Sequence, residues 1–252
     1  MTRTYAIANQ KGGVAKTTTA INLAAALAAL ERRVLLVDCD PQGNATRGLG
    51  RSAATPNLHH VLTGQAESAA AIRPSGFPHL DLLPADRELV GVEVEFAALE
   101  AWEQRLREAL EPVACGYDFV LLDTPPSLGH LTILALVAAD GVLVPMQCEY
   151  FALEGISELL ATVRRVAAAF RPGLTVAGIV LTMYDDRMNL TRDVEAEIRA
   201  HFPQATLRTV VPRNVRLAEA PSHGLPILQY DIKSRGAEAY LALAREILER
   251  TP

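Results

Sequence analysis

K-G-G-V-A-K-T-T-T, residues 11–19, is the stretch that decides the fold. It follows the short apolar run Y-A-I-A-N (5–9) and leads into an alanine- and leucine-rich stretch (17–30) that is typical of a helix. A strand, a glycine-rich loop that ends in lysine and threonine, and a helix are the parts of a phosphate-binding loop. Such a loop turns backbone N–H groups around a phosphate, and the helix N-terminus adds a positive dipole. The stretch therefore predicts a nucleotide site.

Each residue type in this loop has a chemical task. Lys16 can reach the β and γ oxygens of a nucleotide, and Thr17 can offer its hydroxyl to Mg²⁺. The alternative is a glycine-rich turn that binds no ligand. The residues expected to contact the nucleotide are Gly12, Gly13, Val14, Ala15, Lys16, Thr17 and Thr18.

Ala15 stands where most such loops have glycine. Alanine in a left-handed conformation costs about 1 kcal/mol relative to glycine. A methyl group that points away from the phosphates leaves every N–H in place, so we expect nucleotide binding to survive, with affinity or turnover at risk.

The distribution of lysine along the chain supports the site, because Lys11 and Lys16 are two of only three lysines among 24 basic residues. This usage indicates positions that need a compact ammonium.

Short apolar runs alternate with helical stretches along the whole chain. This alternation is typical of buried parallel strands, so we predict a three-layer α/β fold (P-loop NTPase) in which a mostly parallel, twisted sheet of about seven or eight strands has helices on both faces. No repeat or linker divides residues 1–252, which predicts a single domain. Residues 45–78, rich in small and polar side chains, look the least ordered. The remaining predicted strands are 33–38, 117–123, 141–145, 176–182 and two near residues 82 and 208.

Composition and charge narrow the function. A net charge of −5 excludes a bulk polycation for nucleic acid, so DNA binding would need a local basic patch. The chain has neither a signal-peptide pattern nor an apolar run long enough to span a membrane, so we expect a cytoplasmic protein.

The three cysteines are far apart in the sequence, which favours reduced, mostly buried thiols. The neighbours His59 and His60 lack a helical metal-binding spacing and are interpreted as surface or packing histidines.

Carboxylates follow two of the predicted strands. V-D-C-D-P-Q-G-N places Asp38 and Asp40 at the carboxyl edge of the sheet, where both can face a bound Mg²⁺ or a water. The run F-V-L-L-D ends in Asp123, which predicts a carboxylate that holds Mg²⁺ directly or through water. The alternatives are a turn cap for Asp38 or Asp40 and a purely structural role for Asp123.

The loop resembles the deviant Walker A ATPases of the ParA and MinD group, K-G-G-x-G-K-[ST], and departs from that pattern only at Ala15. The resemblance implies that Lys11 contacts the ATP of a partner chain, so that ATP holds a homodimer together. It also implies that Asp40 orients the attacking water while Asp38 supports the metal and the loop. The catalytic residues implied are Lys11, Lys16 and Asp40.

Further stretches look like the chromosomal ParA/Soj partition ATPases over nearly the full length. That resemblance implies that Pro212 and Asn214 lie beside the adenine, and that ATP-bound dimers bind double-stranded DNA without sequence preference through Arg187 and Arg216. It also implies a ParB-type partner that stimulates slow hydrolysis, and association with the nucleoid. The stretches are 145–155 (P-M-Q-C-E-Y-F-A-L-E-G), 181–187 (L-T-M-Y-D-D-R), 211–228 (V-P-R-N-V-R-L-A-E-A-P-S-H-G-L-P-I-L) and 234–240 (S-R-G-A-E-A-Y).

Other functions remain open at this stage. A MinD-like positioning ATPase needs a C-terminal amphipathic helix with a basic polar face, whereas the basic residues near the end of this chain are balanced by glutamates, which favours a packed helix and no membrane contact. A cluster-bearing electron carrier needs cysteine pairs that are not evident. A nucleotide-dependent adaptor with little hydrolysis is the most serious alternative. The arginines could also be solvated and paired with Asp185, Asp186 and Glu219.

Overall fold

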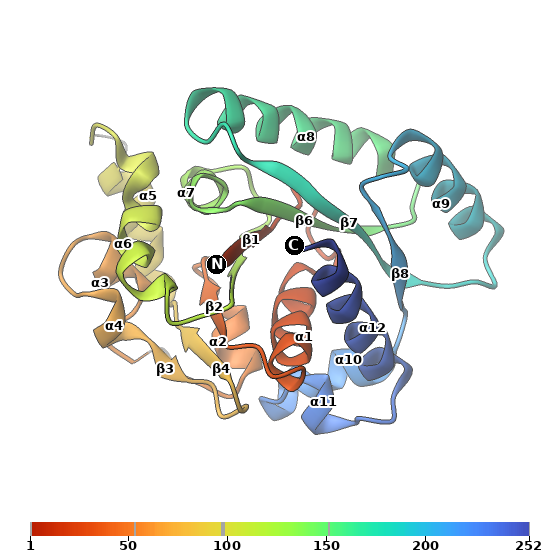
Figure 1. The fold of residues 1–252 in the computed structure, drawn as a ribbon, viewed down its shortest axis with the longest axis horizontal. Coiled ribbons are helices and arrows are strands. Elements are labelled where there is room, and N and C mark those ends of the chain that lie inside the picture. Colours follow the sequence, from red (N-terminus) through yellow and green to blue (C-terminus); the bar gives the residue numbers. More distant parts are fainter. Residues whose placement is uncertain (1, 53, 97–98, 151, 252) are drawn as a thin grey trace.

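A twisted sheet runs through the middle of the molecule (Figure 1). The computed structural model describes residues 2–52, 54–96, 99–150 and 152–251, and within them the sheet has eight strands in the order β3-β4-β2-β5-β1-β6-β7-β8. Among these described strands, only β3 pairs antiparallel with its neighbour. The strands are β1 (Arg3–Ile7), β2 (Val34–Asp38), β3 (Arg73–Pro74), β4 (Leu80–Leu83), β5 (Phe119–Asp123), β6 (Gly141–Gln147), β7 (Thr175–Tyr184) and β8 (Thr206–Pro212).

Helices cover both faces of the sheet (Figure 1), so the predicted three-layer architecture is confirmed. The α-helices are α1 (Lys16–Ala29), α2 (Asn44–Gly48), α3 (Leu58–Leu62), α4 (Ser68–Ala71), α5 (Val90–Phe96), α6 (Arg105–Ala114), α7 (His130–Ala138), α8 (Ala152–Ala169), α9 (Asn189–His201), α10 (Val215–Glu219), α11 (Ile227–Tyr230) and α12 (Arg235–Arg250). The described residues also form three 3₁₀ turns, which are η1 (Arg87–Leu89), η2 (Trp102–Gln104) and η3 (Ala220–His223).

Each face of the sheet has its own hydrophobic core. Alternate residues of a strand point to opposite faces, so Val120 of β5 lies in the core that contains residues of α7 and α8, while Leu121 lies in the core that contains residues of α1 and α12. All five residues of β5 are buried. The continuous apolar runs in the sequence follow from this burial on both faces.

The C-terminal helix α12 is packed, as predicted. Ser234 caps it by accepting a hydrogen bond from Ala237 N (3.1 Å), and Tyr240 is fully buried, with its hydroxyl 3.2 Å from that of Thr19. The carboxylate of Glu246 is also buried and accepts hydrogen bonds from the backbone N–H groups of β8. In the part of the chain that the structure describes, no helix combines the length and apolar character needed to cross a membrane.

The strand predictions fall within two residues of the observed ends, except for the unpredicted edge strand β3. The expectation for residues 45–78 was wrong. This segment contains helices α3 and α4 and most of α2, because Leu58, Val61, Leu62 and Ala71 anchor it in the core. Of the cysteines, Cys39 and Cys148 are buried and Cys115 is exposed, all three as free thiols.

Two glycines bring distant parts of the backbone into direct contact. Gly50 follows α2 and Gly224 follows η3, and both have positive φ (66° and 67°). A Cβ added at Gly224 would lie 2.5 Å from the Cα of Gly50, so no side chain fits there without a backbone shift. The segment that follows β2 is therefore held against the segment that follows β8.

Candidate functional site

The glycine-rich loop between β1 and α1 has the turn that its sequence predicts. Gly13 and Ala15 both have positive φ (76° and 63°), and Ala15 lies in the left-handed region with ψ at 34°. The carbonyl of Ala15 still accepts a hydrogen bond from Thr19 N at 2.8 Å, so α1 starts normally after it. Alanine is therefore accommodated, with the expected strain of about 1 kcal/mol confined to its own backbone.

The loop is tied to the strands beside it. Thr182 of β7 donates to the carbonyls of Val14 and Met146, 3.1 Å from each. Asn9 donates its side-chain amide to Pro145 O at 2.7 Å, and its Oδ1 accepts from Lys11 N at 2.9 Å. These bonds fix both ends of the loop to the central strands.

The two loop lysines have different environments. Lys16 is 7% exposed, and its ammonium donates to the carbonyl of Lys11 at 3.1 Å. Burial lowers the pKa of Lys16, while Asp123 and Asp40 act in the opposite direction. The Lys11 side chain is half exposed and forms an ion pair with Glu149, which follows β6. Lys16 therefore points into the site, whereas Lys11 is at the surface and available to a neighbouring molecule.

Asp123, at the end of β5, is a buried carboxylate without ordinary partners. Both of its oxygens are inaccessible, and neither has a hydrogen-bond partner of normal geometry among the described residues. Burial raises the pKa of Asp123 well above its usual range, and Asp38 adds to the rise, whereas the hydroxyl of Thr17 and the ammonium of Lys16 lower it. A group in this position is costly unless a cation binds to it. Asp123 and Thr17 together therefore fit a divalent metal ion.

Asp38 and Asp40 have separate surroundings although they lie two residues apart. Asp38 is fully buried, and one of its oxygens accepts hydrogen bonds from Thr46 N (2.8 Å) and Thr46 Oγ1 (2.7 Å). Burial raises the pKa of Asp38 to about 6, against the lowering effect of these bonds. Asp40 accepts from Gln42 N at 2.9 Å and thereby also caps the turn that follows β2. Asp40 lines the polar cavity beside the loop, whereas Asp38 is buried below it and holds the backbone of Thr46 in place.

Two adjoining cavities meet at Ala15 and Met183. The first, of about 320 Å³, contains the polar part of the site, and the second, of about 360 Å³, is mostly apolar. The first is lined by Gly12, Gly13, Ala15, Lys16, Thr17, Thr18, Asp40, Asn44, Thr124, Pro126 and Met183. The second is lined by Ala15, Thr18, Thr182, Met183, Val211, Pro212, Arg213, Asn214, Val215, Leu217, Ala218 and Tyr240. A polar and an apolar compartment side by side suit the phosphates and the base of a nucleotide.

Comparison with known proteins agrees with this geometry. Residues 2–176 match the family model of an AAA domain. The chain is 54% identical over 248 residues to the chromosome-partitioning ATPase Soj of Thermus thermophilus, covering 98% of this chain and 96% of that protein. It is 51% identical over 252 residues to the chromosome partitioning protein ParA of Caulobacter vibrioides, covering 98% and 94%.

The chain belongs to the ParA/Soj family of chromosome-partitioning ATPases. Solved structures agree on the fold. A Mycobacterium smegmatis protein described as cobyrinic acid a,c-diamide synthase, with bound ATP analogue and magnesium, has a TM-score of 0.87 at 38% identity, covering 99% of this chain and 95% of that one. The cell division ATPase MinD of Pyrococcus furiosus has a TM-score of 0.82 at 28% identity, covering 99% of both. The predicted P-loop fold is thereby confirmed.

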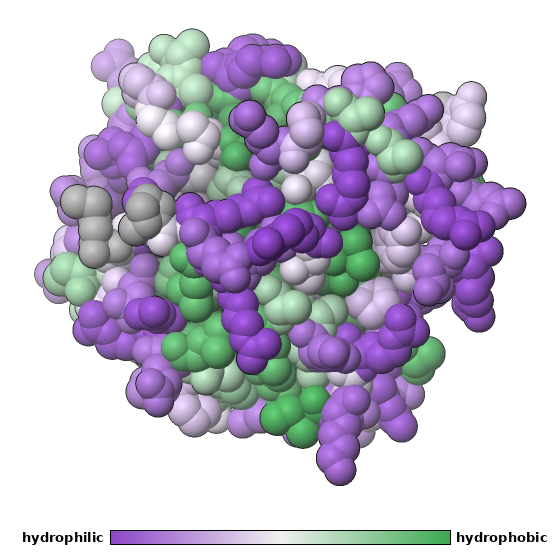
Figure 2. Space-filling view, turned by 45° about the vertical axis from the view of Figure 1, so that its right-hand side comes forward, coloured by the Kyte–Doolittle hydropathy of each residue, from purple (hydrophilic) through white to green (hydrophobic). Residues whose placement is uncertain are grey.

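Arg187 and Arg216 of this ParA/Soj-family chain line neither of the two cavities. Arg187 is 83% exposed and forms an ion pair with Asp185 (2.7 Å), and Arg216 pairs with Glu219 (2.9 Å) and more loosely with Asp231 (3.6 Å). Figure 2, which brings the α9 and β8 side toward the viewer, shows a face covered mostly by hydrophilic side chains. The pairing with acidic neighbours weighed in the sequence analysis is therefore present for both arginines.

A wide groove of about 810 Å³ adjoins Arg187. Arg213 and Arg235 line it, and neither forms an ion pair with another described residue. Arg235, at the start of α12, was missed by the sequence analysis because the chain folds α12 back against β8 over a long sequence separation. Thr46 was missed for a similar reason, since only the packed structure brings its hydroxyl to Asp38.

Proposed function

We propose that this chain is an ATP- and Mg²⁺-dependent DNA-partitioning switch formed by a single domain, residues 1–252. In this proposal an ATP-bound homodimer binds double-stranded DNA without sequence preference and is reset by slow hydrolysis. One observation carries the nucleotide part: the buried carboxylate of Asp123, which has no hydrogen bond of normal geometry within the described part of the chain, faces Thr17 and Lys16 at the end of the glycine-rich loop. Relatives about half identical to this chain are named as chromosome-partitioning proteins, which supports the same function here.

The polar cavity would hold the phosphates. Backbone N–H groups of residues 12–18 would surround them, Lys16 would neutralise the β and γ oxygens, and Thr17 and Asp123 would hold Mg²⁺ with Asp38 in support. The apolar cavity would take the base between Pro212 and Asn214. The solved relative with a bound ATP analogue and magnesium supports these ligands.

Hydrolysis would depend on positioning and electrostatics rather than on covalent chemistry. Bound Mg²⁺ supplies neutralisation of the phosphate charge. Asp40 lines the cavity and is the carboxylate best placed to orient a water. Replacing Asp40 by Ala should trap an ATP-bound dimer, which size-exclusion chromatography with ATP would detect. Unchanged turnover would show that another group positions the water.

Dimerisation would use the exposed surface around the loop. Lys11 is half exposed, and its present partner Glu149 is equally accessible, so its ammonium is free to exchange that partner for a phosphate of a second chain. A half-exposed ion pair is worth about 1 kcal/mol or less, which a phosphate contact outweighs. Lys11 would in this way make ATP part of the interface.

DNA binding would follow from dimerisation, since each protomer contributes Arg187 and Arg216. If each of these arginines neutralises one phosphate, a dimer covers about four, and log K should fall with log salt at a slope of about −3.6. Dimerisation doubles the patch and thereby couples DNA binding to ATP. The ATP-bound dimer would thereby associate with the nucleoid, and a ParB-type partner would stimulate hydrolysis and release it from the DNA.

The deciding experiment is DNA binding by the purified protein with ATP-Mg²⁺, ADP-Mg²⁺ or no nucleotide, over a series of salt concentrations. Binding that requires ATP and weakens steeply with salt supports the switch. Equal binding in all three states would refute the coupling. Phosphate release, measured in parallel with ATP binding, separates the switch from an adaptor that binds nucleotide with little hydrolysis. ATP-dependent sedimentation with vesicles but not with DNA would favour a MinD-like positioning ATPase.

A further inference from the structure

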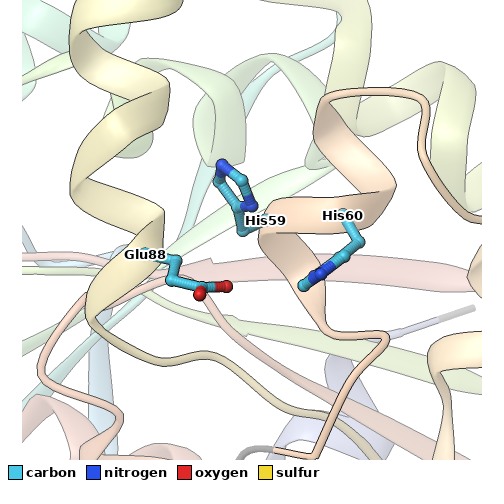
Figure 3. Close-up of side chains that lie close together, drawn as sticks. All are labelled: His59, His60 and Glu88. Atoms are coloured by element: carbon cyan, nitrogen blue, oxygen red, sulfur yellow. The ribbon is translucent and has the colours of Figure 1, made fainter.

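His59, His60 and Glu88 meet at a distance from the nucleotide site (Figure 3). The histidines belong to the short helix α3 and Glu88 to the turn η1. One ligand atom from each of the three residues lies within 4.8 Å of the others. In Figure 3 the carboxylate of Glu88 points toward the helix that carries both rings. No helical metal-binding spacing follows the histidine pair in the sequence, because the third group comes from a different segment.

Each histidine ring has one nitrogen that faces an oxygen. Nδ1 of His60 lies 2.9 Å from Oδ1 of Asn57, and Nε2 of His59 lies 3.7 Å from Oε1 of Glu95. Metal-binding histidines usually donate their second N–H to a carboxylate or an amide oxygen, which fixes the tautomer. A proton on these two nitrogens leaves His59 Nδ1 and His60 Nε2 as the nitrogens with lone pairs.

The lone pair on His59 has no other use in the described part of the chain. His59 Nδ1 is buried and lacks a hydrogen-bond partner there. A buried polar atom left unpaired costs about 1–3 kcal/mol, whereas a histidine that merely packs usually has its nitrogens satisfied. The Glu88 carboxylate likewise forms no hydrogen bond or ion pair with another described residue. Two ligand groups are therefore available without breaking any contact.

We propose that His59, His60 and Glu88 bind a divalent transition-metal ion, with Zn²⁺ as the best match. Two imidazoles and one carboxylate are the ligand set of open zinc sites, in which a water takes the fourth position. Mg²⁺ and Ca²⁺ prefer oxygen ligands, so the ion that serves the nucleotide is a poor competitor here. With bonds of about 2.0–2.2 Å, tetrahedral ligands lie roughly 3.5 Å apart. Glu88 is exposed, so its side chain can rotate and bring the ligand atoms, which now lie within 4.8 Å of one another, to that shorter separation.

A metal at this position would join α3 to η1. Hydrogen bonds connect the residues next to these two elements to the nucleotide site. Asn57, which orients His60, donates to Asp86 Oδ2 at 2.9 Å. The residue before Asp86, Ala85, donates its N–H to Thr46 Oγ1 at 3.1 Å, and Thr46 in turn donates its hydroxyl to the carboxylate of Asp38. The metal would therefore stabilise the segment that braces the nucleotide site from behind.

The test is Zn²⁺ binding to the full-length chain, stripped of metal and nucleotide and kept in excess Mg²⁺. All proteins carry Cys115→Ser, because Cys115 is an exposed thiol that could bind zinc by itself. Isothermal titration gives the stoichiometry and affinity, and Co²⁺ as a substitute probe gives visible absorption bands typical of a four-coordinate site. The proposal predicts one ion per chain and, on saturation, a higher unfolding temperature.

Two cluster variants and two control variants decide where the ion binds. Glu88→Gln changes only an exposed side chain and should weaken Zn²⁺ binding about tenfold or more, and His60→Ala about 100-fold or more. Glu67→Gln and His201→Ala, exposed residues outside the cluster, are matched controls and should bind as the reference does. Loss confined to the cluster variants supports the site. Undiminished binding in Glu88→Gln and His60→Ala, or no binding by the reference chain, would overturn it.

Discussion

Two charged regions of this chain differ in how far their charged side chains are exposed to water. Around the glycine-rich loop, Asp38 and Asp123 are 0% exposed and Lys16 only 7%. On the side of β8, the side chains of Arg187 and Arg208 are 83% and 72% exposed. The first set is held out of water by the strands that carry it. The second is in water, with each arginine paired to a nearby carboxylate.

The difference decides how strongly each charge acts. Buried charges interact through a low effective dielectric and are hardly screened by salt, whereas exposed pairs are worth about 0–1 kcal/mol and weaken as salt rises. A single residue should therefore control the nucleotide site, while DNA binding should depend on several arginines that each contribute a little.

Lys16→Ala should have the largest effect. The variant removes the buried cation that faces Asp123 and Asp40, so the phosphates lose their main positive partner while the carboxylates remain. We expect ATP affinity to fall at least about 100-fold, the size typical of a lost buried charge pair. Titration with a fluorescent ATP analogue measures the loss. Lys233→Ala, at an exposed lysine, is the control, and equal affinity in the two variants would refute the contrast.

Glu246→Gln tests whether a buried charge in the second region behaves like those in the first. The Glu246 carboxylate accepts from Arg208 N and Thr209 N (2.8 Å each) and pairs with Arg250 at 3.0 Å. We expect the free energy of unfolding to drop by about 2 kcal/mol, because an amide cannot replace both charged acceptors. Urea unfolding at pH 7 measures the drop. Glu249→Gln, at an exposed partner of Arg208, should change it by less than about 0.5 kcal/mol.

The same variant predicts a pH dependence. Burial alone would raise the pKa of Glu246, but the backbone N–H groups of Arg208 and Thr209 outweigh it and lower the pKa below its ordinary value of 4.5. A lowered pKa gives stabilisation that is complete above the unfolded-state value and is lost as the pH falls through the folded-state value. The stability difference between wild type and Glu246→Gln should therefore shrink below about pH 4.5. A constant difference down to pH 3 would contradict this origin.

Arg216→Ala should have a smaller, graded effect on DNA binding. Losing one arginine per protomer removes two phosphate contacts from a dimer, so the salt slope should become shallower by about 1.8. We expect the affinity for DNA at moderate salt to fall about threefold to tenfold, while ATP-dependent dimerisation stays unchanged. Fluorescence anisotropy with labelled duplex DNA measures both. Arg245→Ala, at an exposed arginine of α12, is the control, and an unchanged slope in Arg216→Ala would remove this residue from the DNA surface.

Ala15→Gly should have the smallest effect. Glycine relieves the left-handed strain of about 1 kcal/mol but gives the unfolded chain more freedom, so the two contributions nearly cancel. We expect stability to rise by less than about 0.5 kcal/mol and ATP affinity to change less than about twofold. Ala29→Gly, at an exposed end of α1, is the matched control and should destabilise by about 0.5–1 kcal/mol. A large gain in ATP affinity in Ala15→Gly would show that Ala15 limits the site.

Local sequence was sufficient to predict the fold and the loop. The continuous apolar runs located seven of the strands, and the conformation of Ala15 followed from its place in the loop. A strand that is buried on both faces has a continuous run of apolar residues, and the residues of the loop follow one another directly in the sequence. Both signals can therefore be recognised without knowing the partners of any residue.

What the sequence could not predict depends on residues far apart in the chain. The order of residues 45–78 comes from a few anchors such as Leu58 in a core made by other elements. Glu88 reaches the two histidines only after η1 has folded next to α3. The support that Thr46 gives to Asp38 likewise requires α2 to fold back over the end of β2. Composition and periodicity contain no record of such pairings.

The contact between Gly50 and Gly224 sets a limit on how this protein can vary. It joins the segment after β2, which carries Asp40, to the segment after β8, which carries Arg216. At this seam backbone lies directly against backbone, with no side chain to absorb a displacement. An alanine at Gly224 would place its Cβ 2.5 Å from the Cα of Gly50, and an alanine at Gly50 would place its Cβ 3.0 Å from the carbonyl oxygen of Gly224, so the backbone would have to shift at either position and more at Gly224. Through this seam, the position of the segment that carries Arg216 is tied directly to that of the segment that carries Asp40.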